Sequence, residues 1–238
     1  MTPEPRVIFF DMDGTLFDWQ TAMDESWRDA CARGCSSFDG VESQALHDAI
    51  LVKRDWFWSD RARATKGRMD LLAASTRVVR EALRSIGHDL PDLAAGIALD
   101  YRTQREDMIT PFPGAIELLE SLRQRDTTTA LITNGAADSQ RRAVERFGLP
   151  RYFDCIVIEG EFGCGKPDER VFRHALTSCG VDPGETWMVG DNYDADIVTP
   201  HGLGMHTVWV DAASGGLPAD AAVRPHRVIR AIGELLEG

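Results

Sequence analysis

The feature that most constrains the fold is a series of five short, mostly apolar runs, each followed by small or acidic residues. They are VIFFD (7–11), TTALITN (128–134), DCIVIEG (154–160), TWMVGD (186–191) and HTVWVD (206–211). Most of these runs are continuously apolar rather than alternating, as is typical of strands buried on both faces of a parallel sheet. Helical patterns lie between these runs, at residues 115–125, 138–148, 168–180 and 195–204. The predicted fold class is therefore α/β, with a doubly wound parallel sheet.

The alternation of strand and helix is interrupted once, after the first run. The residues from about 18 to 110 contain no convincing strand and show helix-period apolar spacing at 19–33, 41–58, 69–87 and 90–107. The segment closes at TPFPG (110–114), where two prolines flank an aromatic residue, a composition typical of a hinge. We therefore expect two domains, an α/β core made of residues 1–17 and 111–238 and a helical domain made of residues 18–110.

Composition and charge argue against several classes of function. The 238 residues carry a formal net charge of -12, which argues against a nucleic-acid or anionic-membrane partner. No segment approaches the roughly 18 apolar residues of a membrane span, and the start, MTPEPRV, does not resemble a signal peptide. The five cysteines are scattered and odd in number, which indicates reduced thiols. We expect a cytoplasmic protein with no nucleic-acid and no membrane partner.

Two of the cysteines raise the alternative of a metal site. Cys31 and Cys35 lie four residues apart on a predicted helix and could form half of such a site. No second Cys or His pair at suitable spacing completes it. We therefore favour simple burial of both thiols.

The segment GEFGCGKPDE (160–169) matches most of a nucleotide-binding phosphate loop, G-x-x-x-x-G-K-[ST]. Pro167 stands where that motif needs Ser or Thr, and it supplies neither a hydroxyl for Mg²⁺ nor an N–H for phosphate. The pattern therefore disfavours an ATP site. Lys166 is one of only 3 lysines against 23 arginines, which favours a specific use of its compact positive charge. We expect Pro167 to begin the following helix.

Polar side chains lie at or after the ends of four predicted strands. In an open α/β sheet these carboxyl ends meet at the edge where ligands bind. The residues concerned are Asp11, Asp13, Thr133, Asn134, Lys166, Asp191, Asp194 and Asp196. Several carboxylates at one edge repel each other unless a cation lies among them, and oxygen ligands suit Mg²⁺, which in turn suits a phosphoryl oxygen. One carboxylate could then attack phosphorus, while a second could protonate the leaving oxygen and later activate water.

Four segments resemble, in order and spacing, the four motifs of the haloacid dehalogenase superfamily. They are DMDGTL (11–16), LITNG (131–135), GKP (165–167) and GDNYDADI (190–197). The resemblance covers essentially the whole chain, and the helical insertion follows the first motif, where that family carries its cap. It implies a Rossmann-like core with a helical-bundle cap domain, and Mg²⁺ as the cofactor.

The resemblance also implies roles for the residues of the first motif. Asp11 would be the nucleophile and a Mg²⁺ ligand. Asp13 would be the general acid/base and would bind Mg²⁺ through its backbone carbonyl. The 2-haloacid dehalogenases of this family lack the second aspartate, because a halide leaves without a proton. The presence of Asp13 therefore favours a phosphatase over a dehalogenase.

The other three motifs supply the phosphate and metal contacts that the resemblance implies. Thr133 and Asn134 would hold the phosphoryl group, and Lys166 would bridge Asp11 and the phosphate. Asp191 would be a Mg²⁺ ligand. Asp196 would be a further ligand or would support the metal ligands from behind. Asp194 lies close enough in the sequence to leave this last assignment open.

The expected function is Mg²⁺-dependent hydrolysis of a small phosphorylated metabolite, such as a nucleotide, a sugar phosphate or a phosphoglycolate-like ester. We expect the enzyme to be a monomer or a homodimer. A phosphomutase of the same fold is the main alternative, and it would need a bisphosphate activator. A non-catalytic regulatory protein is disfavoured because no motif residue is missing.

The expected cap contains one segment with two interpretations. RDWFWSDRARATKGR (54–68) places Trp56, Phe57 and Trp58 ahead of Arg61, Arg63, Lys66 and Arg68. It could be a substrate loop with an aromatic shelf and a cation for a second anionic group. It could instead consist of core aromatic residues followed by a solvated basic turn, which is the interpretation we favour for each individual residue.

Overall fold

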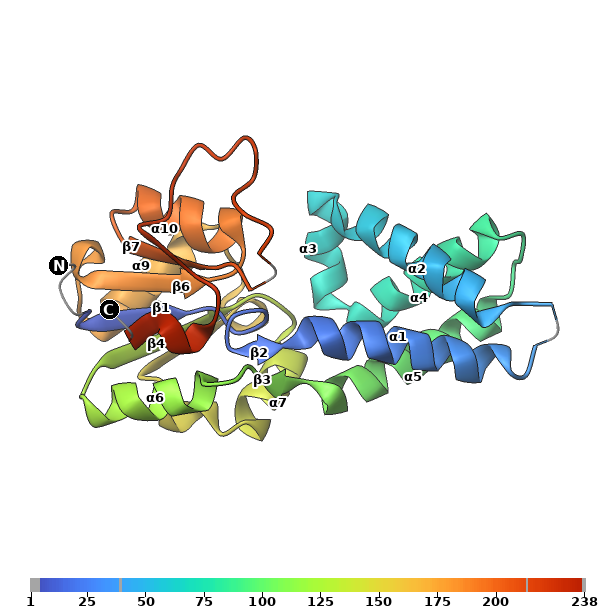
Figure 1. Ribbon diagram of the computed structural model, residues 1–238, viewed down its shortest axis with the longest axis horizontal. Coiled ribbons are helices and arrows are strands. Elements are labelled where there is room, and N and C mark those ends of the chain that lie inside the picture. Colours follow the sequence, from blue (N-terminus) through green and yellow to red (C-terminus); the bar gives the residue numbers. More distant parts are fainter. Residues whose placement is uncertain (1–4, 39, 213, 237–238) are drawn as a thin grey trace. The chain divides into compact units, whose positions relative to one another are not determined.

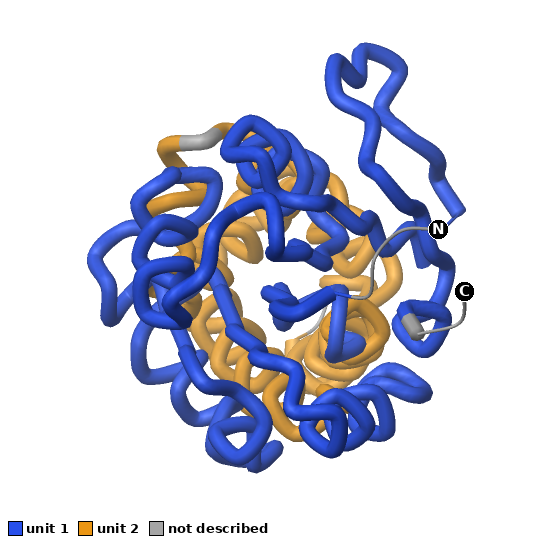
Figure 2. Tube along the Cα trace, turned by 90° about the vertical axis from the view of Figure 1, so that its left-hand side faces the viewer, with its two compact units in different colours: residues 1–18, 111–238 blue, residues 19–110 orange. Residues whose placement is uncertain are grey.

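We analysed a computed structural model of the chain, which describes residues 5–38, 40–212 and 214–236. The chain divides into two compact units, coloured separately in Figure 2. One unit contains residues Met1–Asp18 and Pro111–Gly238, and the other contains Trp19–Thr110. The two linking segments, β2 (Phe17–Asp18) and β3 (Thr110–Pro111), pair as a two-stranded sheet.

The first unit is built on a six-stranded sheet in which every described strand pair is parallel. Its strand order is β5 (Cys155–Ile158), β4 (Thr128–Thr133), β1 (Val7–Phe10), β6 (Thr186–Gly190), β7 (His206–Val210) and β8 (Arg227–Ile229). The five predicted apolar runs form five of these strands, and the short edge strand β8 was not predicted. The chain proceeds from β1 to one side and then returns to the other, so the predicted doubly wound α/β fold is confirmed.

Helices cover both faces of this sheet, with α6 and α7 on one side and α9 and α10 on the other (Figure 1). The elements are α6 (Ala115–Gln124), α7 (Ala137–Arg146), η1 (Leu149–Arg151), α8 (Glu159–Phe162), α9 (Glu169–Cys179), η2 (Pro183–Glu185), η3 (Tyr193–Val198), α10 (Thr199–Gly202) and η4 (Ile232–Leu236). Because the sheet is covered on both faces, β1 needs apolar side chains on both, and all four of its residues are buried.

Two predicted details of these helices are wrong. Pro167 does not begin a helix; it lies in a turn, and α9 begins at Glu169 after Asp168, whose carboxylate accepts a hydrogen bond from the Arg170 N–H. Residues 195–204 do not form one helix either. They are divided between the π-helical segment η3 and the short helix α10.

The second unit is helical and is formed by α1 (Trp19–Cys35), α2 (Ser43–Trp58), α3 (Arg61–Met69), α4 (Leu71–Ser85) and α5 (Pro91–Met108). Its core is apolar and aromatic, and Trp27 stacks on Tyr101 with 3.5 Å between ring centroids. Cys31 and Cys35 are buried in this core as free thiols. Burial raises the pKa of Cys31 to about 12, so this thiol is held in its neutral form.

The aromatic and basic segment of this unit differs from its expected form. Residues 61–69 are not a turn but helix α3, which begins after Asp60, whose carboxylate accepts a hydrogen bond from the Arg63 N–H. Phe57 is a core residue, but Trp56 and Trp58 are 40% and 37% exposed, so the expectation of three core aromatics is wrong for two of them. The Arg63 guanidinium lies 4.2 Å from the ring centroid of Trp56. The Arg61 side chain lies outside the described part of the structure.

None of the helices in the described ranges combines the length and the apolar character that a membrane crossing requires.

Candidate active site

The site lies where the central strands of the first unit end. β1 is flanked by β4 and β6, and Phe10 is in register with Leu131 and Val189. The Asp11 N–H donates to the Val189 carbonyl at 2.9 Å, which extends the ladder one residue beyond β1. The three parallel strands therefore deliver Asp11, Asn134 and Asp191 to the same edge of the sheet.

The loop after Asp11 requires a glycine at its third position. Gly14 has a φ of +89°, a conformation that an L side chain rarely adopts. A Cβ atom there would also lie 2.3 Å from Asp191 Oδ2. On either side, Met12 and Leu16 are buried, and the Leu16 N–H donates to the Met12 carbonyl at 3.0 Å. The glycine thus allows the first-motif loop to turn tightly against Asp191.

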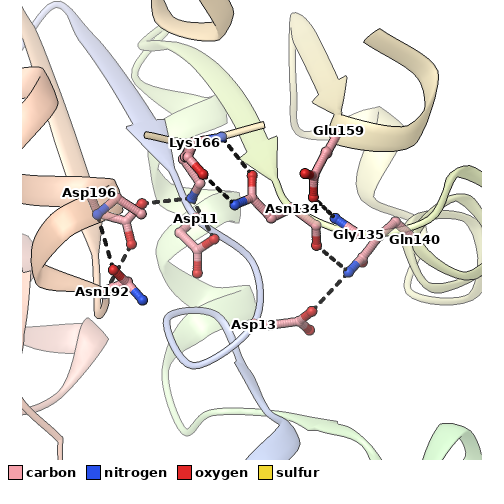
Figure 3. Close-up of polar contacts among 10 residues, drawn as sticks. Asp11, Asp13, Asn134, Gly135, Gln140, Glu159, Lys166, Asn192 and Asp196 are labelled. Carbon is pink, nitrogen blue, oxygen red and sulfur yellow. Dashed lines mark hydrogen bonds and ion pairs between the residues drawn. The ribbon is translucent and has the colours of Figure 1, made fainter. Parts of the chain in front are cut away.

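A buried lysine lies between two buried aspartates (Figure 3). Lys166 is 3% exposed, and its Nζ lies 2.6 Å from Asp11 Oδ1 and 2.6 Å from Asp196 Oδ1. Burial by itself would lower the pKa of Lys166, but the two carboxylates outweigh burial and hold the pKa above its ordinary value. The lysine is therefore a fixed positive charge in contact with the predicted nucleophile.

The negative charge at this site exceeds what Lys166 can neutralise. Carboxylate oxygens of Asp11, Asp191 and Asp196 lie within 4.8 Å of one another. Burial, and then the charges of Asp11 and Asp196, raise the pKa of Asp191 to about 8. For Asp196, burial raises the pKa to about 6 although Lys166 opposes this effect. Three carboxylates and one ammonium group leave an excess of negative charge in a poorly solvated place.

The donor set of this cluster fits a hard divalent cation. Asp11 Oδ2 is buried, and no described residue donates a hydrogen bond to it. A buried carboxylate oxygen without a donor is costly, and a cation would remove that cost. Carboxylate oxygens are the ligands that Mg²⁺ prefers. Asp11, Asp191 and Asp196 are thus the side chains that could hold Mg²⁺.

The structure distinguishes between the two aspartates that the sequence left open. Asp196 is fully buried and its Oδ2 accepts the Asn192 N–H at 3.0 Å, whereas Asp194 is exposed. The local backbone also favours this arrangement, because the Asn192 side chain accepts the Ala195 N–H at the start of η3. Asp196, and not Asp194, therefore belongs to the acidic cluster.

The second motif links the end of β4 to the loop that carries Lys166. The Asn134 side chain makes two 2.8 Å hydrogen bonds to the Lys166 backbone, donating to its carbonyl and accepting from its N–H (Figure 3). These bonds fix the Lys166 backbone relative to the end of β4. The preceding residue, Thr133, is buried at the end of β4. The phosphate-binding roles of Thr133 and Asn134 remain predictions.

Asp13 lies apart from the acidic cluster and points toward α7 (Figure 3). Its Oδ2 accepts a hydrogen bond from Gln140 Nε2 at 3.0 Å. Nearby, Glu159 is buried and its carboxylate accepts the Gly135 N–H at 2.9 Å. The sequence reasoning missed both Gln140 and Glu159. Gln140 could have been noticed, because it lies four residues before Val144 on the face of α7 that is buried.

Comparison with known proteins agrees with this geometry. The family described as haloacid dehalogenase-like hydrolase matches residues 5–204. Phosphoserine phosphatase from Thermus thermophilus is 40% identical over 149 residues, which are 63% of this chain and 58% of that protein, so the chain spans less than two thirds of that relative. N-acylneuraminate-9-phosphatase from Rattus norvegicus is 28% identical, with 97% of this chain and 92% of that protein covered.

Among solved structures, the magnesium-bound HAD-type hydrolase YfnB from Bacillus subtilis superposes with a TM-score of 0.77 over 99% of this chain and 98% of that chain. At 21% sequence identity, this likeness concerns the fold alone. The two phosphatase relatives support the predicted class of enzyme, a phosphatase. The family match, which covers most of the chain including all four motifs, shows that this protein belongs to the haloacid dehalogenase-like hydrolases.

Proposed function

We propose that this protein is a Mg²⁺-dependent phosphatase that hydrolyses small phosphomonoesters through an aspartyl-phosphate on Asp11. The observation that carries the proposal is the placement of Lys166, buried and 2.6 Å from both Asp11 and Asp196, beside a third carboxylate of the same cluster. A phosphoryl group has several negatively charged oxygens, and a site for it needs fixed positive charge at the attacking carboxylate.

The first half of the proposed reaction transfers the phosphoryl group to the enzyme. A carboxylate oxygen of Asp11 forms a bond to phosphorus while the bond from phosphorus to the ester oxygen breaks. Asp13 gives its proton to that departing oxygen, so the product leaves as an alcohol rather than as an alkoxide. Lys166 holds positive charge beside the phosphoryl oxygens during this transfer.

The second half regenerates the carboxylate. Asp13, now ionised, takes a proton from a water molecule as that water attacks the phosphorus of the aspartyl-phosphate. The bond between phosphorus and the Asp11 oxygen breaks, and inorganic phosphate is released. When bound by Asp11, Asp191 and Asp196, Mg²⁺ would polarise a phosphoryl oxygen and offset the charge that develops in the transition state.

The substrate class is part of the proposal. Phosphoserine, N-acylneuraminate 9-phosphate and, for a relative from Methanopyrus kandleri, glyceraldehyde 3-phosphate appear in the names of similar phosphatases, and all are small phosphomonoesters. A small phosphorylated metabolite therefore remains the proposed substrate. We also propose that the helical unit acts as a cap that selects the leaving group, and that the enzyme works in the cytoplasm as a monomer or homodimer.

The test is the release of inorganic phosphate from a panel of phosphomonoesters, with and without Mg²⁺, by the wild type and by Asp11→Asn. We expect release that needs both Mg²⁺ and Asp11, and the ranking of the panel narrows the substrate. Folded wild-type protein that releases no phosphate from any ester would overturn the proposal. Release that needs a bisphosphate activator and is accompanied by transfer to the product would indicate a phosphomutase instead.

A further inference from the structure

One buried side chain outside the four motifs connects the predicted general acid to the second-motif loop. Gln140 is 8% exposed and lies near the start of α7. Its Nε2 donates to Asp13 Oδ2 at 3.0 Å and to the Asn134 carbonyl at 2.9 Å, as Figure 3 shows. Asp13 lies in the loop after β1 and is 127 residues from Gln140 in the sequence. Asn134 lies in the loop after β4 and is 6 residues from Gln140.

The orientation of this amide is determined by its surroundings. Both contacts are acceptors, one a carboxylate oxygen and the other a backbone carbonyl. An amide oxygen in the same place would face the lone pairs of two acceptor oxygens and would be repelled by both. The NH₂ group is therefore the end of the amide that points toward them. Both hydrogens of Nε2 therefore have an acceptor.

The loop is shaped to accommodate Gln140. Gly135 has a φ of +142°, and a Cβ atom on it would lie 2.7 Å from Gln140 Nε2. A glutamine that merely filled the core would not need such a close approach to a backbone. A leucine or methionine would fill the same volume next to Val144 without burying an amide that must be satisfied.

We propose that Gln140 is a positioning residue that fixes the direction of the Asp13 carboxylate, so that Asp13 can deliver its proton to the leaving oxygen. The inference rests on the proposed function, because it assigns Gln140 a part in the proton-transfer step of that reaction. Proton transfer depends steeply on the placement of the acid, and replacing Gln140 removes a donor that orients the Asp13 carboxylate.

The experiment compares two substrates that differ in their need for a proton. An alkyl phosphate must be protonated as it leaves, whereas p-nitrophenyl phosphate has a leaving group stable enough to depart as an anion. We would measure kcat/KM for both esters with the wild type and with Gln140→Met, which keeps the unbranched shape and removes both donors. The exposed residue Glu145 lies on the same helix, and Glu145→Ala is the matched control.

For Gln140→Met we expect kcat/KM for the alkyl ester to fall by about 10- to 100-fold, since a general acid supplies about 10²–10⁴-fold in total. The value for p-nitrophenyl phosphate should change far less, and inhibition by vanadate, which occupies the phosphoryl site, should not change. Glu145→Ala should behave as the wild type with both esters. If Gln140→Met does not fold, Gln140→Asn retains the amide but withdraws it by one methylene, and the same split between the two esters is expected.

Equal losses with both esters, together with weaker vanadate inhibition, would show that Gln140 only supports the phosphate loop, and this result would overturn the inference. Unchanged kinetics with both esters would overturn it as well. In either case the wild type is still active, so the proposed function stands. A folded wild type that releases no phosphate from these two esters or from any other ester of the panel would overturn the proposed function and this inference together.

Discussion

The cores of the two units differ in how they treat charge. The α/β unit buries ionisable side chains at the carboxyl end of its sheet or close to it, namely Asp11, Glu159, Lys166, Asp196 and Asp211. Among the described residues of the helical unit, no Asp, Glu, Lys or Arg is buried. Its core is mainly aliphatic, aromatic and cysteine side chains, and its buried polar residues are Ser26, His47 and Ser75. Burying an ion is costly unless it is paired, and buried ionisable side chains are therefore concentrated at functional sites. The difference therefore separates the unit in which the proposed chemistry lies from the unit that packs as a helical domain.

The largest effect should come from removing the buried cation. Lys166→Met leaves Asp11 and Asp196 without their shared partner, and breaking a buried ion pair costs about 3–5 kcal/mol of folding free energy. The loss of one electrostatic contact to the transition state should lower kcat by a further factor of about 10²–10³. Urea unfolding and phosphate-release assays measure the two effects.

Lys66→Met provides the control, because Lys66 is an exposed residue of α3 and its replacement should leave the free energy of unfolding unchanged. Mg²⁺ should also recover part of the stability of Lys166→Met, since a cation can offset the remaining carboxylates. A variant as stable as the wild type in the absence of divalent ions would contradict the view that the cluster depends on Lys166.

In the helical unit, the largest effect should come from packing. Trp27 is 2% exposed and stacks on Tyr101, so Trp27→Ala leaves a large cavity and should cost about 3–5 kcal/mol. Calorimetry can show whether this cost falls on one transition or on both. Since Trp27 and its contacts belong to one unit, we expect the transition of that unit to move to lower temperature. An equal shift of every transition would mean that the two units unfold as one.

A smaller effect should follow from crowding the first-motif loop. Gly14→Ala places a Cβ atom 2.3 Å from Asp191 Oδ2 on a backbone with φ of +89°. A non-glycine residue in such a conformation costs about 1–3 kcal/mol, and the clash should also displace Asp191 from the acidic cluster. We expect weaker binding of Mg²⁺, measured as a higher Mg²⁺ concentration at half-maximal rate. Gly184→Ala is a suitable control, because a Cβ atom there meets nothing within 4 Å.

The sequence was sufficient to predict the parts of the fold that follow from patterning and chain order. Five apolar runs identified five strands, and the motif residues after them indicated which side chains would gather at the sheet edge. The segment 61–69 was harder to assign, because its basic residues show little apolar periodicity and α3 is held by the Asp60 N-cap. β8 has only three residues, too few for an alternating pattern to be recognised.

The contacts of Gln140 and Glu159 could not be predicted in the same way. Both contacts join segments that are distant in the sequence. Gln140 reaches Asp13 in the loop after β1, and Glu159 reaches the Gly135 N–H in the loop after β4. A propensity or a motif describes neighbours along the chain, whereas these bonds depend on the register of β1, β4 and β5. The distinction between Asp194 and Asp196 is similar, because only the turn at the start of η3 decides which carboxylate points inward.

The smallest predicted effect concerns the α/β unit away from its acidic cluster. His206 stacks on Trp187 and on His226, with centroid distances of 4.6 and 4.3 Å, and His226 also stacks on His201 at 5.1 Å. Burial, and then the neighbouring charges of His226 and Arg227, lower the pKa of His206 to about 4. The unfolded chain therefore binds a proton at this residue over a pH range in which the folded protein does not.

The contribution of His206 to the free energy of unfolding should consequently rise with pH between the folded pKa of about 4 and the ordinary value of 6.5. The raised pKa values of Asp191 and Asp196 act in the opposite direction, so the contribution of His206 has to be measured as a difference between the wild type and a variant. Urea unfolding of the wild type and of His206→Gln at pH 5 and pH 7 measures this contribution, and the free energy of unfolding of the wild type minus that of the variant should increase from pH 5 to pH 7. The pKa of His226 is lowered as well, first by burial and then by His201, so part of the pH dependence should survive in the variant. A difference between the wild type and the variant that is the same at pH 5 and pH 7 would show that His206 is protonated equally in the folded and unfolded states.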